Sequence, residues 1–433
     1  MRRYLGLASA AFVLLAGCTS GSSHTSAKAA DSGTTGATTA AHADDARAPG
    51  VTADTIKVGV SYVDLKAIRN LTTIDHGDYE AAYRAMFDDI NAHGGINGRK
   101  IVPVFAPVNP VGTQPAEAAC VKLTQDQQVF AVMGFFQSDA PLCYVETHDT
   151  AVIGGAMTPD RLKRAKAPWF AFDPSSDQES DVISMFAKKN LLDGKLAVFS
   201  TSLDQALLKG VVSPLLAKLG IKPVATSVLD APDNDVAAQN AATQVIAEKF
   251  KSAGATKVLI IGDGGLTWAN GVEKTDYRPQ LLFTKINSIA AFYKDKAARD
   301  LSLMKGALLG DLYGPAAASR DEGKMKACLA IQEKAGLQIP ADPDSIPNNA
   351  PNQYVSSAAA CQNVSLFKAI AEKAGKTLNY GTFRNAGEHL GSFDMPGSPQ
   401  PYHYGPAPAL DGNPPIYLYS WNPATKGFDR SGS

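Results

Sequence analysis

The chain alternates short apolar runs with longer segments in which apolar residues recur every three or four positions. The first run, 56–60, is short and rich in β-branched residues, which is typical of a buried strand. After a polar loop, apolar residues fall on one face of a predicted helix at Tyr79, Tyr83, Met86, Phe87 and Ile90. Gly94 and Gly95 end this helix, because glycine tolerates the left-handed backbone of a helix terminus. Residues 101–106 form the next apolar run and predict a second strand.

Two strands joined by a helix run parallel, with a right-handed crossover. Residues 56–108 therefore predict a βαβ unit, whose first loop lies where open parallel sheets bind ligands. The same alternation predicts further strands at 129–134, 151–154, 169–172, 196–199, 223–229, 257–262, 281–283 and 416–421. It predicts further helices at 116–127, 141–148, 177–189, 205–219, 236–253, 321–335 and 353–374. Residues 263–265 are expected to form a tight turn.

A chain of 433 residues is too long for one ordinary core, so we expect two lobes. Alternating strands and helices indicate an α/β fold in which each lobe is a parallel sheet with helices on both faces. We place the first passage between lobes at 173–176 and the return at 306–310. The N-terminal lobe then comprises 51–172 and 311–395, and the C-terminal lobe comprises 173–310 and 396–433.

Residues 89–100 read Asp-Ile-Asn-Ala-His-Gly-Gly-Ile-Asn-Gly-Arg-Lys. This run resembles the DINAxGGINGxK signature of type I periplasmic binding proteins, the leucine/isoleucine/valine-binding family of branched-chain amino acid ABC transporters. The resemblance covers about 51–428. It implies a two-lobed type I fold with a ligand cleft between the lobes, and ABC permease subunits as partners.

The N-terminus has the features of an export signal. Arg2 and Arg3 precede an apolar run that is too short to span a bilayer, so residues 1–17 are predicted to be a signal peptide. Residues 15–18, Leu-Ala-Gly-Cys, resemble a bacterial lipobox, which implies that Cys18 is lipidated; an ordinary signal peptide that contains a cysteine is the alternative. Residues 18–50 are rich in Ser, Thr, Ala and Gly and are expected to be a disordered tether. We therefore expect an exported protein, lipid-anchored to the outer face of the bacterial cell membrane.

Four cysteines remain after Cys18. Export permits disulfides, and three pairings are possible. We expect Cys120–Cys143 and Cys328–Cys361, because each pair flanks or lies on successive predicted elements; buried free thiols are the alternative. No CxxC and no His-x-x-x-His spacing occurs, so no metal site is expected.

Charge and motifs narrow the function. A net charge of −1 without a basic run gives no reason to expect nucleic-acid binding. The chain has no GxSxG, P-loop, HExxH or dinucleotide-binding motif, so we expect neither an enzyme nor a cofactor.

Ligand-binding residues are expected in the loops that follow the strands. The resemblance implies that Ser138 and Thr158 bind the ligand's carboxylate together with the backbone around Ala156; helix capping is the alternative role for both side chains. Further candidates are Tyr62, Asp75, Gln137, Asp263 and Trp268.

The second lobe departs from the family pattern. Gln205 stands approximately where amino-acid binders carry an aromatic residue, and Lys285 stands near the position of their acidic residue. A lysine cannot pair with an ammonium group, so we expect a ligand without one, which would itself supply the counter-charge of Lys285. The alternative is that Lys285 points to solvent.

Together these features predict a lipid-anchored extracytoplasmic solute-binding protein. It would close on a small polar ligand, which is amino-acid-like, an amide or an organic acid, and deliver it to an ABC-type permease. The alternative is a ligand sensor of the same fold that signals to a membrane receptor.

Overall fold

The computed structural model describes residues 48–70, 72–137, 139–173, 178–232, 235–294, 299–312, 314–347 and 349–431. The predicted signal peptide, Cys18, Ser138 and most of the first predicted passage between lobes lie outside the described residues. Within the described ranges, no helix is both long enough and apolar enough to cross a membrane.

The first sheet confirms the predicted βαβ unit. Its five strands are parallel and lie in the order β2-β1-β3-β4-β5. They span Thr55–Val63 (β1), Lys100–Val108 (β2), Ala131–Gly134 (β3), Ala151–Ile153 (β4) and Trp169–Phe170 (β5). The connecting helices are α1 (Tyr79–Ala92), α2 (Gln114–Val121), α3 (Ala140–Leu142) and α4 (Pro159–Arg164), with π-helical turns η3 (Lys122–Asp126) and η4 (Cys143–Thr147). Tyr83 and Phe87 of α1 are fully buried, as the helical pattern predicts.

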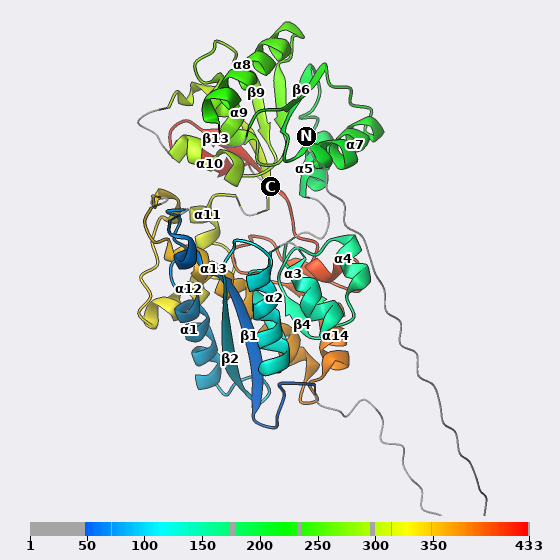
Figure 1. Cartoon of the computed structure of the whole chain (residues 1–433), viewed down its shortest axis with the longest axis vertical. Coiled ribbons are helices and arrows are strands. Elements are labelled where there is room, and N and C mark those ends of the chain that lie inside the picture. The colour runs from blue at the N-terminus through cyan, green and yellow to red at the C-terminus, as the bar shows by residue number, and fades with distance from the viewer. Residues whose placement is uncertain are drawn as a thin grey trace, which may run out of the picture. The chain divides into compact units, whose positions relative to one another are not determined.

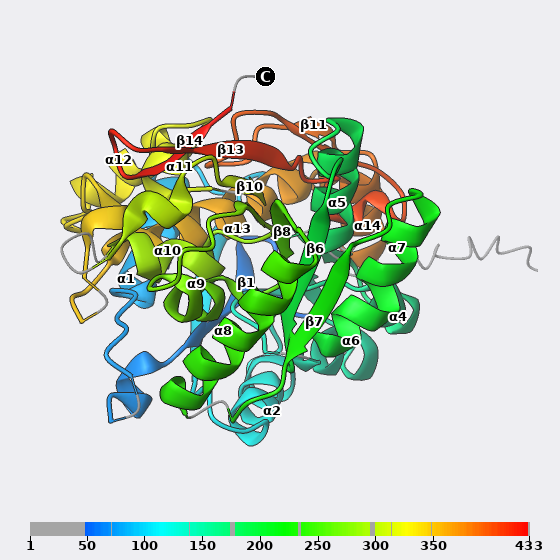
Figure 2. The same ribbon diagram turned by 90° about the horizontal axis from the view of Figure 1, so that it is seen from above.

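Helices from much later in the chain complete this lobe. They are α11 (Ala316–Arg320), α12 (Met325–Lys334), α13 (Gln353–Ala374) and α14 (Tyr380–Glu388). Helix α13 packs on α1, β3 and β4, and α12 also contacts α1. Figures 1 and 2 show α2 on the opposite face of the sheet from α13, so helices cover both faces.

The family-like run at the end of α1 has a structural role. Gly95 has φ +71°, and a Cβ there would lie 2.0 Å from the carbonyl oxygen of Arg99. The Asn91 amide bonds both the N–H (2.7 Å) and the C=O (2.9 Å) of Ile101 at the start of β2. Asn97 donates to the carbonyl oxygens of Ala371 and Glu372, both at 3.1 Å. The run therefore joins the βαβ unit to α13.

Strand β2 is an edge of the first sheet. Pro103 pairs with Val58 and Pro107 with Tyr62, at positions of the same parity along the strand. Proline is tolerated at a sheet edge because it has no N–H to contribute to a ladder. Between the two prolines, the carbonyl of Phe105 accepts a hydrogen bond from the ammonium of Lys122 at 2.8 Å.

The second sheet has the order β14-β13-β10-β9-β8-β6-β7. Its strands are β6 (Leu196–Thr201), β7 (Ala225–Leu229), β8 (Lys257–Ile260), β9 (Gln280–Phe283), β10 (Leu308–Asp311), β13 (Tyr417–Asn422) and β14 (Gly427–Arg430). Strands β7, β6, β8, β9 and β10 are parallel, and the β13–β14 hairpin adds on antiparallel to β10. The associated helices are α5 (Gln178–Lys188), α6 (Gln205–Leu207), α7 (Ser213–Lys218), α8 (Val236–Ser252), α9 (Gly265–Val272) and α10 (Asn287–Lys294), with the π-helical turn η5 (Leu208–Val212) between α6 and α7.

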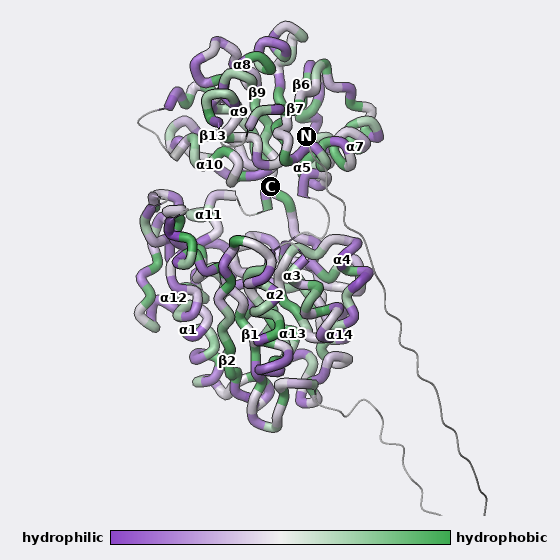
Figure 3. Tube along the Cα trace, viewed as in Figure 1, coloured by the Kyte–Doolittle hydropathy of each residue, from purple (hydrophilic) through white to green (hydrophobic). Residues whose placement is uncertain are grey.

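Both faces of the second sheet are buried, as the uninterrupted apolar runs predict. Ala197 and Phe199 of β6 belong to one core cluster, together with residues of α8 and α9. Leu196 and Val198 belong to the other, together with residues of α5 and η5. Figure 2 shows α8 and α9 side by side, in agreement with their contacts. In the first sheet, Figure 3 likewise shows hydrophobic residues, in green, along β1 and β2.

The tight turn expected at 263–265 overlaps an observed turn at 262–264. It leads directly into α9, a helix that the sequence analysis did not predict and whose two glycines lower its helix propensity. Residues 306–310, where we placed the return between lobes, lead into β10, a strand of the second sheet. One assignment near the C-terminus was wrong. Tyr402, Tyr404 and Leu410 were assigned to the C-terminal lobe but lie in the core of the first sheet. Elements that the sequence analysis did not predict include α10, α14, β14 and the hairpin β11 (Gly391–Phe393) and β12 (Tyr402–Tyr404).

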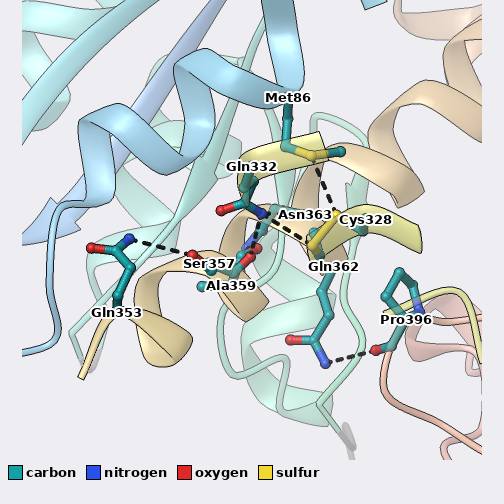
Figure 4. Close-up of a disulfide and its surroundings, with 10 residues drawn as sticks. Met86, Cys328, Gln332, Gln353, Ser357, Ala359, Gln362, Asn363 and Pro396 are labelled. Atoms are coloured by element: carbon teal, nitrogen blue, oxygen red, sulfur yellow. Dashed lines mark hydrogen bonds between the residues drawn. A yellow bond between two sulfur atoms is a disulfide. The ribbon is translucent and has the colours of Figure 1, made fainter. Parts of the chain in front are cut away.

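Both predicted disulfides are confirmed. Figure 4 shows the surroundings of Cys328–Cys361, which links α12 to α13. The sulfur of Cys328 lies 3.3 Å from that of Met86 on α1. The fully buried Gln332 donates to the sulfur of Cys361 (3.2 Å) and to the carbonyl of Ser357 (3.0 Å). Three helices therefore meet at this disulfide.

The contact between α14 and the first sheet gives a test of the fold. A Cβ at Gly387 would lie 2.1 Å from the ring of Phe170. We expect Gly387→Ala to lower the free energy of unfolding by about 1–3 kcal/mol through overpacking. Gly210→Ala is the control, because its Cβ would meet no atom within 4 Å; this change should be neutral or stabilising by up to ~1 kcal/mol. Urea unfolding measures both, and equal effects would contradict the packing of α14.

Candidate ligand-binding site

The carboxyl edge of the first sheet is tightly packed. Gly134 ends β3 with φ +114°, and a Cβ there would lie 2.1 Å from the carbonyl oxygen of Ser61 in β1. Gly154 follows β4 with φ +91°, and its Cβ would lie 2.9 Å from Oδ1 of Asn363. Only glycine fits such positions, so the loops after β3 and β4 leave the sheet close together.

Buried polar groups lie beneath these loops. Ser61, Tyr83, Tyr144 and Asn363 each have no more than 2% of their surface exposed. Burial raises the pKa of Tyr83, whose hydroxyl lies against Asn363, and it also raises the pKa of Tyr144, whose hydroxyl lies near Ser61. Both hydroxyls are therefore protonated at neutral pH, so these two tyrosines add no charge beneath the loops.

Hydrogen bonds within the chain hold the predicted residues of the loops after β3 and β4. Thr158 is the N-cap of α4, and its hydroxyl accepts the N–H of Arg161 at 3.3 Å. The guanidinium of Arg161 bonds the carbonyl of Ala156 (2.9 Å) and the carboxylate of Asp139 (2.8 Å). The amide of Gln137 donates to the carbonyl of Pro110 at 2.6 Å. The capping role of Thr158 is confirmed, and Arg161, which the sequence analysis missed, links the two loops.

Tyr62 and Asp75 line one cavity of about 410 Å³ beside the start of α1. The hydroxyl of Tyr62 donates to Glu80 (2.8 Å), and its ring stacks on Tyr79 with centroids 5.7 Å apart. Burial raises the pKa of Tyr62, and the hydrogen bond to Glu80 raises it further. Burial lowers the pKa of His76, against an opposing effect of Asp75, so this imidazole is neutral at pH 7. The structure thus brings two predicted residues together in an aromatic and polar cavity.

In the second lobe, Lys285 follows β9 and has an anionic partner. Its ammonium lies 3.4 Å from the carboxylate of Glu179 on α5, whose side chain is 4% exposed. Burial by itself lowers the pKa of Lys285, but the charges of Glu179, Asp263 and Asp204 raise it overall. The expectation that the ligand supplies the counter-charge of Lys285 is therefore wrong. Its side chain is 32% exposed, so it lies only partly in solvent.

The other predicted second-lobe residues follow neighbouring strands of the same sheet edge. Gln205 opens α6 after β6, and Asp263 follows β8; both are exposed. Asp204 accepts hydrogen bonds from the N–H of Asp263 (3.1 Å) and the hydroxyl of Thr201 (3.3 Å). Trp268, in contrast, is fully buried against Phe199 and Phe250, so its candidacy as a ligand residue was wrong.

Sequence reasoning could not find Glu179 or Asp204. Glu179 is 106 positions from Lys285, and only the packing of α5 beside the sheet brings the two side chains together. Asp204 precedes a short helix and has the ordinary appearance of a turn residue.

Comparison with known proteins agrees with this architecture. A family model described as periplasmic binding protein matches residues 55–426. A comparison with curated protein sequences finds no match.

Solved structures share the fold at low sequence identity. An ABC transporter substrate-binding protein from Desulfitobacterium hafniense, in complex with Leu, has a TM-score of 0.59 at 16% identity and covers 87% of this chain and 100% of its own. The solute-binding protein of an ABC transporter from R. palustris, in complex with 4-hydroxybenzoate, has a TM-score of 0.58 at 15% identity, covering 88% and 96%. A fatty acid ABC transporter substrate-binding protein from Thermomonospora curvata has a TM-score of 0.55 at 17% identity, covering 89% and 93%.

The family match spans both sheets, and the two sheets, one parallel and one largely parallel, with helices on both faces, have the type I architecture of these solved structures. The chain therefore belongs to the periplasmic binding protein family, whose members bind solutes for ABC transporters and are not enzymes.

Proposed function

We propose that this protein is a lipid-anchored, extracytoplasmic solute-binding protein that delivers a small ligand to an ABC-type permease. The family match over residues 55–426 carries the proposal. The loops at the carboxyl edges of the two sheets support it, because open parallel sheets bind ligands at this edge. The lipobox-like residues 15–18 support the anchor, since several acyl chains hold a protein stably on a membrane.

The ligand is proposed to carry a carboxylate, which Ser138, Thr158 and the backbone around Ala156 bind. Thr158 and Ala156 lie in one loop that Arg161 links to Asp139 in the next, so the loops are positioned before a ligand arrives. The ligands named for the three solved structures are leucine, 4-hydroxybenzoate and a fatty acid, all of which carry a carboxylate. Gln137 supports this loop through its bond to Pro110.

The rest of the ligand is proposed to contact Tyr62 and Asp75 in the first lobe and Gln205, Asp263 and Lys285 in the second. Because Glu179 already neutralises Lys285, and Asp263 adds an exposed negative charge, an ammonium group on the ligand is not disfavoured. Amino acids therefore stand beside organic acids as candidate ligands.

Mass spectrometry of the purified protein under native conditions should detect a bound carboxylate, and a thermal-shift screen should identify others. A ligand at 100 times its dissociation constant should stabilise the protein by about 2.7 kcal/mol. The methyl ester of the same compound should stabilise it far less. Thr158→Val should weaken binding by roughly tenfold or more, whereas Thr158→Ser, which keeps both hydroxyl and cap, should not. Equal binding of acid and ester would reject the carboxylate site.

The pairing of Lys285 with Glu179 is tested by a double-mutant cycle on the ligand-free protein. Lys285→Met should cost about 2–3 kcal/mol, because it leaves a buried carboxylate without this cation. Glu179→Gln should cost less, about 1–2 kcal/mol, because the freed lysine can turn to solvent. The double variant should be less destabilised than the sum of the two. Strictly additive effects in urea unfolding would show that the two charges do not interact.

Lipid anchoring is tested by cell fractionation. Cys18→Ser should move the protein from the membrane fraction to the soluble extracytoplasmic fraction, because no acyl chain can be attached. The thermal midpoint should be unchanged, since residue 18 lies far in sequence from the first strand at Thr55. A variant that stays with the membrane would mean that another feature holds the protein there.

A further inference from the structure

The two disulfides lie in different environments. Cys328 and Cys361 are 6% and 0% exposed, and Met86 and Gln332 lie against their sulfurs (Figure 4). Cys120 is equally buried, but Cys143 is half-buried and lines a cavity of about 590 Å³. A thiolate must reach a disulfide sulfur to reduce it, so access favours attack on Cys143 over attack on the other pair.

A histidine lies beside the more accessible disulfide. A ring nitrogen of His148 and the sulfurs of Cys120 and Cys143 all lie within 4.8 Å of one another. His148 ends the π-helical turn that Cys143 begins, and its backbone N–H donates to the carbonyl of Cys143 at 3.1 Å. A protonated imidazole at this distance stabilises a neighbouring thiolate, which makes that sulfur a better leaving group.

This disulfide also links η4, which lies beside a proposed ligand-binding loop, to helix α2. Cys143 begins η4 shortly after the loop that contains Gln137, and Cys120 lies on α2. Tyr144, the neighbour of Cys143, is buried, and its ring packs edge-on against Phe136 with centroids 5.6 Å apart. Loss of the covalent link would leave η4, against which Phe136 packs, held by non-covalent contacts alone.

We propose that Cys120–Cys143 is a redox-responsive site that an extracytoplasmic dithiol reduces, and that reduction lowers ligand affinity. A thiolate of the dithiol attacks Sγ of Cys143, the Cys120–Cys143 bond breaks, and Cys120 leaves as a thiolate next to His148. The second thiol of the dithiol then attacks the mixed disulfide and releases Cys143. The dithiol loses two electrons and becomes a disulfide, and the protein gains two thiols. The effect on affinity rests on the proposed solute-binding function; the reduction itself does not.

The first experiment measures reduction in the folded wild-type protein. The protein is incubated with dithiothreitol at fixed pH, alkylated at intervals and mapped by peptide mass spectrometry. We expect Cys120 and Cys143 to be alkylated at least about tenfold faster than Cys328 and Cys361. Equal rates, or faster reaction of Cys328–Cys361, would overturn the proposal.

The second experiment tests the histidine. His148→Gln should slow reduction of Cys120–Cys143 several-fold without changing the rate at Cys328–Cys361. His403→Gln, at an exposed histidine on β12, is the matched control and should change neither rate. An unchanged rate of reduction in His148→Gln would show that His148 does not assist the reaction.

The third experiment compares ligand binding by oxidised and selectively reduced, alkylated protein from one preparation, using the carboxylate found in the thermal-shift screen. Affinity should fall on the order of tenfold on reduction. Unchanged affinity with selective reduction would overturn the regulatory effect. If no ligand binds either form, the solute-binding proposal fails, while the alkylation rates still decide whether the site is redox-responsive.

Discussion

The docking of α13 on the first sheet is the interaction on which the first lobe depends. Asn97 reaches the carbonyl of Ala371 across 274 positions of sequence, and Arg99 reaches Lys376 across 277. Phe367 and Ile370 of α13 are fully buried in the core of this sheet. Strands β3 and β4, which α13 contacts, therefore lack this cover until the chain has passed through the second sheet and returned. Loop-closure entropy makes such late contacts slow to form, so folding of the lobe must await most of the chain.

The docking of α13 also helps to position the loops at the carboxyl edge of the first sheet. Asn363 of α13 lies against Gly154 and Tyr83, and thereby closes the sheet edge beneath the loops after β3 and β4. Gln137 and Arg161 then fix those loops to their neighbours through carbonyl and carboxylate partners. A site held by such bonds loses less conformational entropy on binding than a loose one. Helix α13, which comes late in the chain, thus helps to position the loops after β3 and β4.

The sequence was informative wherever local periodicity matched tertiary burial. The apolar faces of α1 and of strands such as β6 and β8 are the faces that are buried, and both cysteine pairs lie on neighbouring elements. Helix α9 was missed because Gly265 and Gly271 lower its helix propensity. The structure shows why glycine is there: a Cβ at Gly271 would lie 2.4 Å from Cβ of Thr243 on α8. The close packing of α8 and α9 therefore requires glycine at position 271, and this glycine lowers the helix propensity from which α9 would have been predicted.

The position of the candidate residues at the sheet edges was predictable from the sequence, but the pairing of their charges was not. Loops after β3, β4, β8 and β9 follow from the parallel sheet, and they carry the predicted residues that the structure describes. The net charge at this edge of the second sheet depends on pairs such as Lys285 with Glu179, which come from separate elements. The local sequence pattern contains no information about such pairs. Once Glu179 is seen to pair with Lys285, an ammonium group on a ligand is no longer disfavoured.

The proline-bearing edge strand has a consequence for how copies of this protein meet one another. An edge strand with free N–H and C=O groups is a template for pairing with another chain, and pairing of this kind leads to aggregation. On β2, the side chain of Asn91 occupies both groups of Ile101, Lys122 occupies the carbonyl of Phe105, and Pro103 and Pro107 have no N–H. Ile101, Pro103, Phe105 and Pro107 have the same parity along the strand, so the outward side of the ladder offers few groups to an incoming strand. Copies of this protein that meet along β2 would therefore find few groups to pair with, so such encounters can end without self-association.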